Sequence, residues 1–279
     1  MRFAIVIPAH NEESYLPKTL ESLARQSLRP HRLVIVDDNS TDNTHRIAAE
    51  FAKQYEYIQV VSRKSEARSL PGAKVVQAFY SGLEKLDEDY DVVCKFDADL
   101  SFPADYLEIV SKAFKSDPNL GMAGGFCQIE KDGQWIQEGL TEKEHIRGAL
   151  KAYRKACFKE IGGLKKAMGW DTIDEQLARY FGWKVMTLDQ LNVKHWKPTG
   201  TTYRSENGRM QGIAFKRMRY GSVLSFLGLA KLALKKKSPA YWFQGIQGYL
   251  SCREEPLVSK DQGKFIRKWR WNKIRKKIF

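Results

Sequence analysis

Three short apolar runs near the start of the chain each end in a polar loop. They lie at Phe3–Ile7, at Leu33–Val36 and between Asp91 and Phe96. A continuous apolar run of this length, bounded by polar residues, is typical of a strand that is buried on both faces of a parallel sheet. The pattern therefore predicts three buried strands that belong to one sheet.

Helical patterns follow these strands. Apolar residues at helical spacing begin at Tyr15, and further helices are predicted over Thr44–Tyr55 and Val75–Leu86. A last strand-like stretch covers Lys184–Val193. Strands that alternate with helices indicate an α/β fold with a doubly wound sheet.

Polar and mostly acidic residues fill the loops after the three strands. The loops are Pro8–Glu13, Asp37–Asp42 and Asp97-Ala98-Asp99. Because the carboxyl ends of parallel strands meet at one edge of a sheet, the three loops are expected to form one site. Residues two apart in a strand point the same way, so Asp97 and Asp99 could reach one hard cation and, through it, a diphosphate. An isolated Asp-x-Asp could instead be a solvated turn.

In their order and spacing, these three loops resemble those of the family 2 glycosyltransferases with the GT-A fold. The resemblance implies a Rossmann-like, mostly parallel sheet flanked by helices. It also implies an inverting transfer of a sugar from a nucleotide diphosphate sugar, with a UDP-sugar expected ahead of a GDP-sugar. The acceptor would be a hydroxyl of a lipid-linked or cell-surface glycan.

The resemblance also implies which residues bind the donor. The base and the ribose would contact Pro8, His10, Glu12 and Asp38. The segment Arg68–Lys74 looks like the family's basic, glycine-containing segment, so Arg68 or Lys74 could meet the base or a phosphate. The other interpretation of this pair is two solvated surface charges.

A divalent metal, Mg²⁺ or Mn²⁺, is expected at the aspartate pair because carboxylates and phosphates are hard oxygen ligands. Asp99 would be the chief ligand, and Asp97 would reach the ribose, the metal or a metal-bound water. Many relatives have a histidine at the place of His195, so this residue could serve as a further metal or diphosphate ligand. A histidine that only packs or caps is the alternative.

The family's catalytic base is expected in the acidic segment Trp170–Glu175, ahead of a helix predicted over Gln176–Phe181. Matching this segment to the family's pattern puts Asp171 on the catalytic aspartate, with Asp174 as the alternative. Acidic residues near a helix start can also stabilise the helix dipole without taking part in any chemistry.

Charge divides the chain into two parts. A chain of 279 residues with 43% hydrophobic residues can bury one large core. Its net charge of +14 is uneven, because residues 200–279 carry 19 Lys and Arg but only 4 Asp and Glu. The sequence therefore predicts a catalytic domain over residues 1–200 and a basic helical tail over residues 201–279.

The tail has the composition of a membrane-surface segment. Its apolar stretch Tyr220–Leu234 is shorter than the ~20 residues that span a bilayer. Lys264–Phe279 mixes eight Lys and Arg with aromatic residues, which suits an anionic membrane surface. Nucleic acid is the less favoured partner, because no recognisable nucleic-acid-binding motif accompanies the charge. The expected localisation is cytoplasmic, peripheral on the inner face of the cell membrane.

Three other functions are alternatives for a chain with these residues. A polyprenyl-phosphate sugar synthase, similar to dolichyl-phosphate mannose synthase, has comparable loops but would depend less on Asp171 and Asp174, because a lipid phosphate needs no strong base. A sugar nucleotidyltransferase would need a glycine-rich loop after its first strand, and Pro8–Glu13 contains no glycine. A non-catalytic membrane or nucleic-acid binding protein would explain the tail but not the acidic loops.

Overall fold

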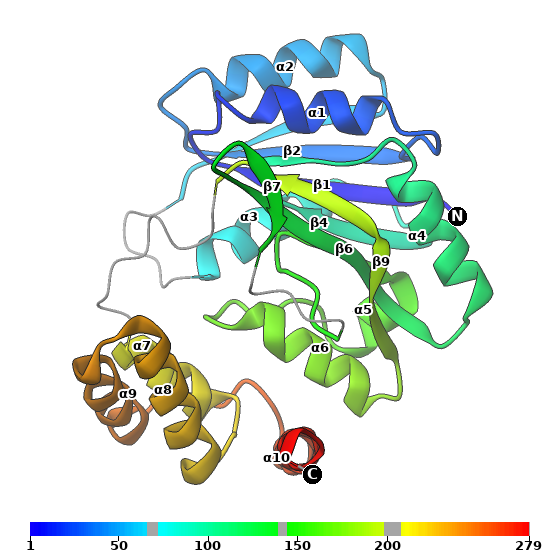
Figure 1. Ribbon diagram of the computed structural model, residues 1–279. Coiled ribbons are helices and arrows are strands. Elements are labelled where there is room, and N and C mark those ends of the chain that lie inside the picture. The colour runs from blue at the N-terminus through cyan, green and yellow to red at the C-terminus, as the bar shows by residue number, and fades with distance from the viewer. Residues whose placement is uncertain (66–71, 139–143, 198–207, 279) are drawn as a thin grey trace.

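The computed structural model of the protein describes residues 1–65, 72–138, 144–197 and 208–278. In this part of the chain one mixed sheet of nine strands lies between α1 and α2 on one face and α3 and α6 on the other (Figure 1). The strands are β1 (Phe3–Ala9), β2 (Arg32–Asp38), β3 (Ile58–Arg63), β4 (Val92–Phe96), β5 (Leu100–Ser101), β6 (Leu120–Lys131), β7 (Gln134–Gln137), β8 (Leu150–Arg154) and β9 (Lys184–His195). The helices are α1 (Leu16–Ala24), α2 (Thr44–Gln54), α3 (Ala73–Leu83), α4 (Tyr106–Ser116), α5 (Lys155–Glu160), α6 (Trp170–Tyr180), α7 (Gly208–Arg217), α8 (Ser222–Lys236), α9 (Pro239–Ser251) and α10 (Lys260–Ile278).

The sheet has a parallel half and a mixed half. Its order is β3-β2-β1-β4-β8-β6-β9-β5, with β7 beside β6. β1, β2 and β4 are parallel, as the buried apolar runs predict, and β3, which was not predicted, is parallel to β2. β8 is antiparallel to both β4 and β6, whereas β9 is parallel to β6. The predicted α/β fold is therefore confirmed, and the half of the sheet that carries the first three loops is entirely parallel.

Burial explains why the first strands are apolar without alternation. Every residue from Phe3 to Ile7 has an exposed fraction of 0%, because helices cover both faces of β1. The first three predicted helices lie within three residues of α1, α2 and α3. The helix predicted over Gln176–Phe181 is wrong at its start, since α6 begins at Trp170. Gly169 adopts a φ of 80° just before it, a left-handed conformation that glycine permits, and so the acidic segment is helical rather than a loop.

The C-terminal residues form four helices in the described part of the chain. α7 and α9 pack so closely that a Cβ on Gly212 would clash with the carbonyl oxygen of Gly245. α8 completes this α7–α9 bundle. α10 instead packs against α6, and its Ile266 is fully buried in the main core. The helical character of the tail is as predicted, and α10 packs it against α6.

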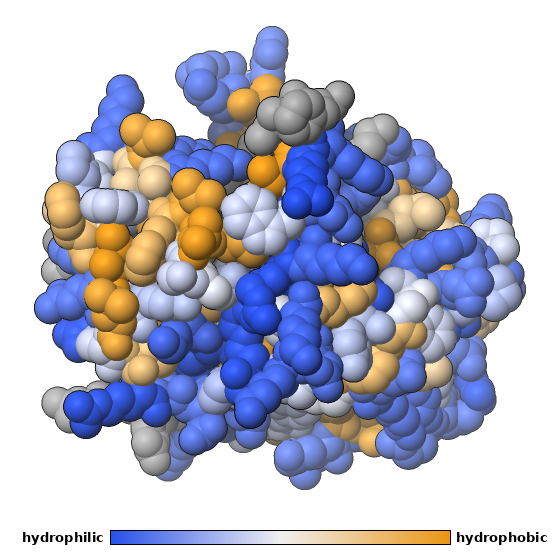
Figure 2. Space-filling model, turned by 90° about the horizontal axis from the view of Figure 1, so that it is seen from below, coloured by the Kyte–Doolittle hydropathy of each residue, from blue (hydrophilic) through white to orange (hydrophobic). Residues whose placement is uncertain are grey.

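The aromatic residues of α10 face the protein, and exposed apolar residues lie elsewhere. Phe265 packs on Tyr180 with ring centroids 5.6 Å apart, and the guanidinium of Arg179 lies 4.9 Å from the Trp269 ring. In Figure 2, hydrophobic side chains gather on the left of the face, over the α7–α9 bundle, beside a band of hydrophilic ones. The most exposed large apolar residues of α8 and α9 are Val223, Leu227, Leu234, Phe243 and Leu250. Among the described helices, none combines the length and the apolar character that a bilayer span requires.

Candidate active site

The first two loops are fastened to each other at the carboxyl ends of β1 and β2. The backbone N–H of Glu12 donates to Thr44 Oγ1 at 2.7 Å, and the N–H of Thr41 donates to Asn11 Oδ1 at 2.8 Å. Asn11 and Asn39 have φ values of 54° and 62°, a left-handed conformation that asparagine tolerates better than most residues. These turns and hydrogen bonds hold the two loops in place relative to each other.

The predicted donor-binding residues of these loops lie side by side. Pro8 is opposite Val36 in the register of β1 and β2. His10 Nδ1 donates to the carbonyl oxygen of Asp38 at 2.8 Å. The carboxylate of Asp38 is buried and accepts from Arg63 Nη1 at 2.9 Å. Arg63, at the end of β3, thus neutralises Asp38 and adds a cation that the sequence analysis did not select.

The Asp97–Asp99 segment is anchored on several sides. Thr19 Oγ1 donates to the carbonyl oxygen of Ala98 at 2.7 Å and accepts from the N–H of Leu100 at 3.0 Å. The N–H of Trp196 donates to the carbonyl oxygen of Asp99 at 3.0 Å. The backbone around Asp99 is therefore held by α1 and by the residue that follows β9.

Asp99 and His195 lie together, at the start of β5 and the end of β9. His195 Nε2 is 3.4 Å from Asp99 Oδ2, and both residues are buried. Although burial lowers the pKa of the imidazole, hydrogen bonds to the carboxylates of Asp99 and Glu138 raise the pKa of His195 to about 9. The site thus concentrates negative charge around a buried ring.

Asp97 contacts a buried lysine in the preceding strand. The ammonium of Lys95, a residue only 2% exposed, pairs with Asp97 Oδ1 and donates to the carbonyl oxygen of Gly148 at 3.0 Å. The Asp97 side chain remains 34% exposed.

Burial raises the pKa of Glu12, its pair with Lys197 at 2.7 Å opposes this, and the charges of Asp99 and Asp97 raise it further. Glu12 therefore lies close enough to Asp97 and Asp99 for their negative charges to affect its pKa.

A second group of possible metal ligands adjoins His195. Ligand atoms of Cys127, Glu138 and His195 all lie within 4.8 Å of one another. Burial raises the pKa of the Cys127 thiol, so the thiol stays protonated, and Arg147 Nε lies 3.3 Å from the carboxylate of Glu138. The carboxylate of Asp99 beside His195 fits a hard divalent cation better than a protonated thiol does.

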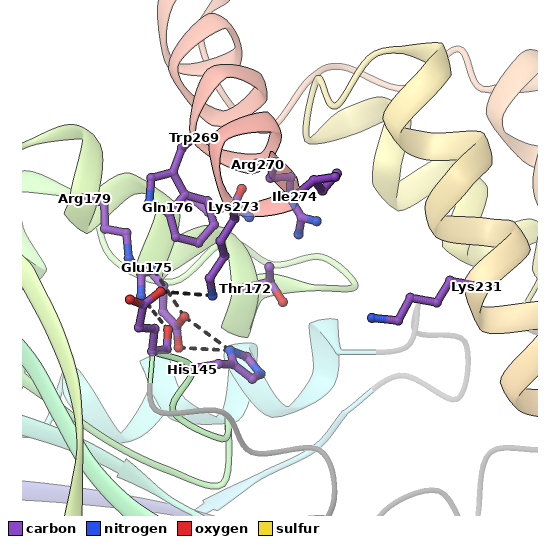
Figure 3. A pocket seen from close by; sticks show the side chains of 11 residues that line it. His145, Thr172, Glu175, Gln176, Arg179, Lys231, Trp269, Arg270, Lys273 and Ile274 are labelled. Carbon is purple, nitrogen blue, oxygen red and sulfur yellow. Dashed lines mark hydrogen bonds and ion pairs between the residues drawn. The ribbon is translucent and has the colours of Figure 1, made fainter. Parts of the chain in front are cut away.

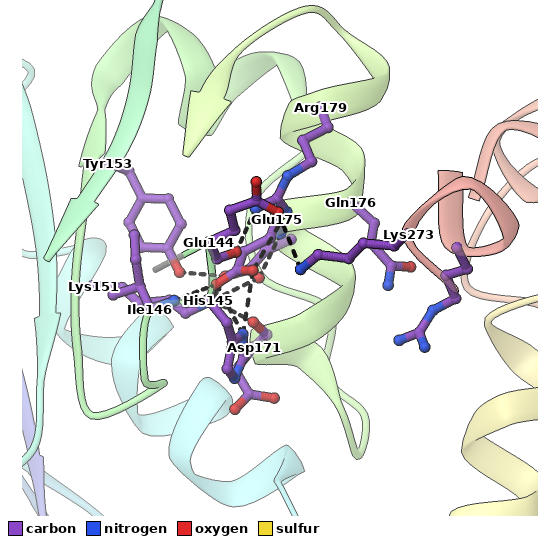
Figure 4. Close-up of polar contacts among 12 residues, drawn as sticks. Glu144, His145, Ile146, Lys151, Tyr153, Asp171, Glu175, Gln176, Arg179 and Lys273 are labelled. Carbon is purple, nitrogen blue, oxygen red and sulfur yellow. Dashed lines mark hydrogen bonds and ion pairs between the residues drawn. The ribbon is translucent and has the colours of Figure 1, made fainter. Parts of the chain in front are cut away.

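The two candidate bases have different surroundings on α6. Asp174 is 1% exposed, accepts from Lys151 Nζ at 2.9 and 3.0 Å, and accepts from the Tyr153 hydroxyl at 2.6 Å. Glu175 joins the same lysine at 3.2 Å. Burial raises the pKa of Asp174, and Lys151 works against that rise. Figure 4 shows Lys151, Tyr153 and Glu175 converging in this buried cluster.

Asp171 points away from the buried cluster in Figure 4 and is half-buried in the first turn of α6. A Cβ on Gly148 would lie 3.1 Å from Asp171 Oδ2 and 3.1 Å from the Trp170 ring. The same glycine accepts from Lys95, the partner of Asp97. Gly148 therefore lies between Lys95, the partner of Asp97, and the side chain of Asp171.

Only residues 72–74 of the basic segment Arg68–Lys74 belong to the part of the chain that the structure describes. Arg68 lies outside the described residues. Lys74 is the second residue of α3 and has no hydrogen bond or ion pair with the residues that the structure describes. A Cβ on Gly72 would lie 3.4 Å from Cδ1 of Trp170, so the start of α3 adjoins α6.

Two buried lysines were not selected from the sequence. Lys95 and Lys151 each interrupt a short strand whose other members are mostly apolar. A lysine in a run of this kind is buried and must be paired, because an unpaired charge in the core is costly. That rule would have found both residues, but not the acids that they meet.

Comparison with known proteins identifies the family. The model of glycosyl transferase family 2 matches residues 4–164, and the chain belongs to this family. The match covers all three polar loops.

Individual relatives agree with this assignment. The chain is 34% identical over 193 residues to the probable glycosyltransferase YdaM of Bacillus subtilis, an alignment that covers 61% of this chain and 45% of the relative. It is 29% identical over 191 residues to the beta-monoglucosyldiacylglycerol synthase of a Nostoc species, covering 61% and 39%. The chain therefore spans less than half the length of both proteins.

Solved structures agree in fold. The mannosyltransferase PcManGT of Pyrobaculum calidifontis, in complex with GDP-Man and Mn²⁺, has a TM-score of 0.59 at 15% identity, covering 98% of this chain and 80% of that one. S. aureus TarS in complex with UDP-GlcNAc has a TM-score of 0.56 at 18% identity, covering 76% and 65%. The chain therefore has the GT-A fold that its loops resemble.

Replacing each candidate base by alanine is expected to separate their structural roles. Asp174→Ala leaves Lys151 buried without its main partner and should lower the free energy of unfolding by about 3–5 kcal/mol. Asp171→Ala removes a half-buried carboxylate and should change it by less than about 1 kcal/mol. Urea unfolding of both variants measures these changes. Equal destabilisation by the two substitutions would contradict a structural role for Asp174 that Asp171 lacks.

Proposed function

We propose that the chain is an inverting glycosyltransferase that moves a sugar from a nucleotide diphosphate sugar to a hydroxyl of a lipid-linked or cell-surface glycan. The observation that carries the proposal is the position of Gly148. Its carbonyl oxygen accepts from Lys95, the partner of Asp97, while its α-carbon faces Asp171. A donor at the aspartate pair and an acceptor at Asp171 would then share one site.

The donor end of the proposed site uses the three loops. Pro8, His10, Glu12 and Asp38 bind the base and the ribose, and Asp97 reaches the ribose or a metal-bound water. Asp99 and His195 would hold Mg²⁺ or Mn²⁺, which would supply positive charge to stabilise the departing nucleoside diphosphate. Lys74, without a partner among the described residues, is free to meet a phosphate.

The nucleotide is proposed as UDP ahead of GDP. TarS binds UDP-GlcNAc, and PcManGT binds GDP-Man with Mn²⁺, so proteins of similar fold accept either base. The names of the relatives include a synthase of a glucosylated diacylglycerol, which supports a lipid-linked acceptor.

Asp171 is proposed as the base in preference to Asp174. Asp174 is committed to Lys151 and Tyr153 in the core and cannot reach an acceptor without breaking that cluster. Asp171 is accessible and borders Gly148. It would take the proton from the acceptor hydroxyl as that oxygen attacks the anomeric carbon from the face opposite the leaving group. One displacement of this kind inverts the configuration.

The tail is proposed to rest on an anionic membrane at the inner face of the cell membrane. Leu234 and Phe243 are 80% and 64% exposed, and Lys235, Lys236 and Lys237 end α8 beside them. Exposed apolar and basic side chains on neighbouring helices suit a membrane surface. The division into a catalytic domain over residues 1–200 and a tail over 201–279 remains part of this proposal, with α10 as the connection to α6.

Calorimetric titration with UDP and GDP, with and without Mn²⁺, tests the donor site. One nucleotide should bind in a metal-dependent way, and Asp99→Ala should abolish that binding without changing the circular dichroism spectrum. Exposed Asp105→Ala, in the same part of the sequence, is the matched control and should bind normally. Normal metal-dependent binding by Asp99→Ala would refute the site.

Replacing Asp171 by asparagine tests the base. Transfer of labelled sugar from the donor to a membrane preparation should fall by about a hundred-fold or more, as expected when a general base is lost. Metal-dependent nucleotide binding should be unchanged, because the donor loops are intact. Transfer that survives would favour the polyprenyl-phosphate sugar synthase, whose acceptor needs no strong base.

Vesicle sedimentation tests the membrane proposal. The full chain should sediment with vesicles of phosphatidylglycerol and phosphatidylcholine but not with phosphatidylcholine alone. Leu234→Asp combined with Phe243→Asp should reduce binding at least about ten-fold, because two apolar contacts are replaced by repelled charges. Equal sedimentation of this variant and the original chain would rule out the α8–α9 surface.

A further inference from the structure

A cavity of about 320 Å³ lies between α6, α8 and α10. Thr172, Gln176 and Arg179 line it from one side of α6, and Thr172 directly follows Asp171. Figure 3 shows Arg270 and Lys273 entering it from α10 and Lys231 pointing toward it from α8. The cavity therefore lies between α6, the helix that carries the proposed base, and the tail helices α8 and α10.

Its acidic residues are already paired. Glu175 is 3% exposed and lies within 3.2 Å of Lys151 and 3.4 Å of Arg179. Glu144 lies 3.1 Å from Lys273. The negative charges at this cavity are thus matched by neighbouring cations.

Two cations of the cavity have no acidic partner among the residues that the structure describes. Arg270 donates to the hydroxyl of Tyr220 at 2.7 Å and stacks on the ring of the same residue at 4.0 Å. Neither Arg270 nor Lys231 has an ion pair with any residue in the described ranges, and Lys231 has no hydrogen bond there either. A guanidinium and an ammonium that face one cavity, with no counter-charge in the described part of the chain, fit a phosphate group.

The surface beside Lys231 is apolar. Leu227 and Leu234 lie one turn before and one turn after Lys231 on the same side of α8, and they are 54% and 80% exposed. Leu234 also lines a groove of about 550 Å³ between α8 and α9, together with Trp242 and Phe243. An aliphatic chain could therefore lie along α8 while the group attached to it occupies the cavity.

We propose that this cavity binds the phosphate of an acceptor whose phosphate is joined to an aliphatic chain. The inference rests on the proposed function and specifies its acceptor class. Lys231 and Arg270 contact the phosphate, and the chain lies against Leu227 and Leu234. This arrangement brings the part of the acceptor beyond the phosphate to Asp171, one residue from the cavity wall.

Calorimetric titration of the full chain with three probes tests the proposal. Geranyl phosphate carries both the phosphate and the chain, inorganic phosphate carries the phosphate alone, and geraniol carries the chain alone. Geranyl phosphate should bind most tightly, inorganic phosphate more weakly, and geraniol most weakly of all. Equal binding of geranyl phosphate and inorganic phosphate would overturn the assignment to a lipid.

Variants of α8 identify the contacts. Lys231→Ala should weaken both phosphate-containing probes about ten-fold, the loss expected for one charge-assisted contact. Lys231→Arg should restore most of the affinity. Leu227→Ser should weaken the binding of geranyl phosphate but not that of inorganic phosphate. Lys115→Ala removes an equal charge from an exposed position of α4, outside the cavity, and is the control.

Two results would overturn the site. In the first, Lys231→Ala binds both phosphate probes as tightly as the original chain. In the second, Lys115→Ala weakens them as much as Lys231→Ala does, which would mean that net charge alone attracts the probes. UDP and GDP titrations with Mn²⁺ on the same samples keep the two proposals separate. Normal nucleotide binding without a phosphate site would reject this inference alone.

Discussion

The buried ammonium of Lys151 is the interaction on which the arrangement of the site depends. It joins β8 to α6 through Asp174 and Glu175, with the Tyr153 hydroxyl as a further donor. A buried charge cluster of this kind tolerates little displacement, because separating its members leaves an unpaired charge in the core. α6 is thereby fixed against the sheet, with Asp171 in its first turn. The outer side of the same helix supports α10, so the tail takes its position from this cluster as well.

Lys95 has a comparable role at the aspartate pair. Its ammonium balances Asp97 and reaches Gly148, whose missing side chain leaves room for Asp171. Lys95 in β4 thus pairs with an acid of the proposed donor site, and Lys151 in the neighbouring antiparallel strand β8 pairs with the acids of α6. Lys95 and Lys151 are directly paired in the register of these strands. Two cations opposite each other would repel, and each is instead directed to its own carboxylates.

Local patterns determined what could be predicted from the sequence. The apolar runs of β1, β2 and β4 and the polar loops after them predicted the parallel half of the sheet, because burial on both faces leaves an unambiguous pattern. The start of α6 was missed, since a left-handed glycine at residue 169 begins a helix that is rich in acids. The family pattern favoured Asp171 over Asp174, but the reason that Asp174 is buried could not be predicted, because its partner Lys151 belongs to β8, distant in the sequence. The direction of the α10 aromatic residues likewise follows from packing on α6 and not from composition.

The most direct test of this account is anomalous diffraction at the manganese edge from crystals grown with Mn²⁺ and the nucleotide that binds. The account predicts one manganese peak at the carboxylate of Asp99, beside His195, with the nucleotide lying against the loops after β1 and β2. A peak within the Cys127, Glu138 and His195 group, or a nucleotide bound away from these loops, would contradict it.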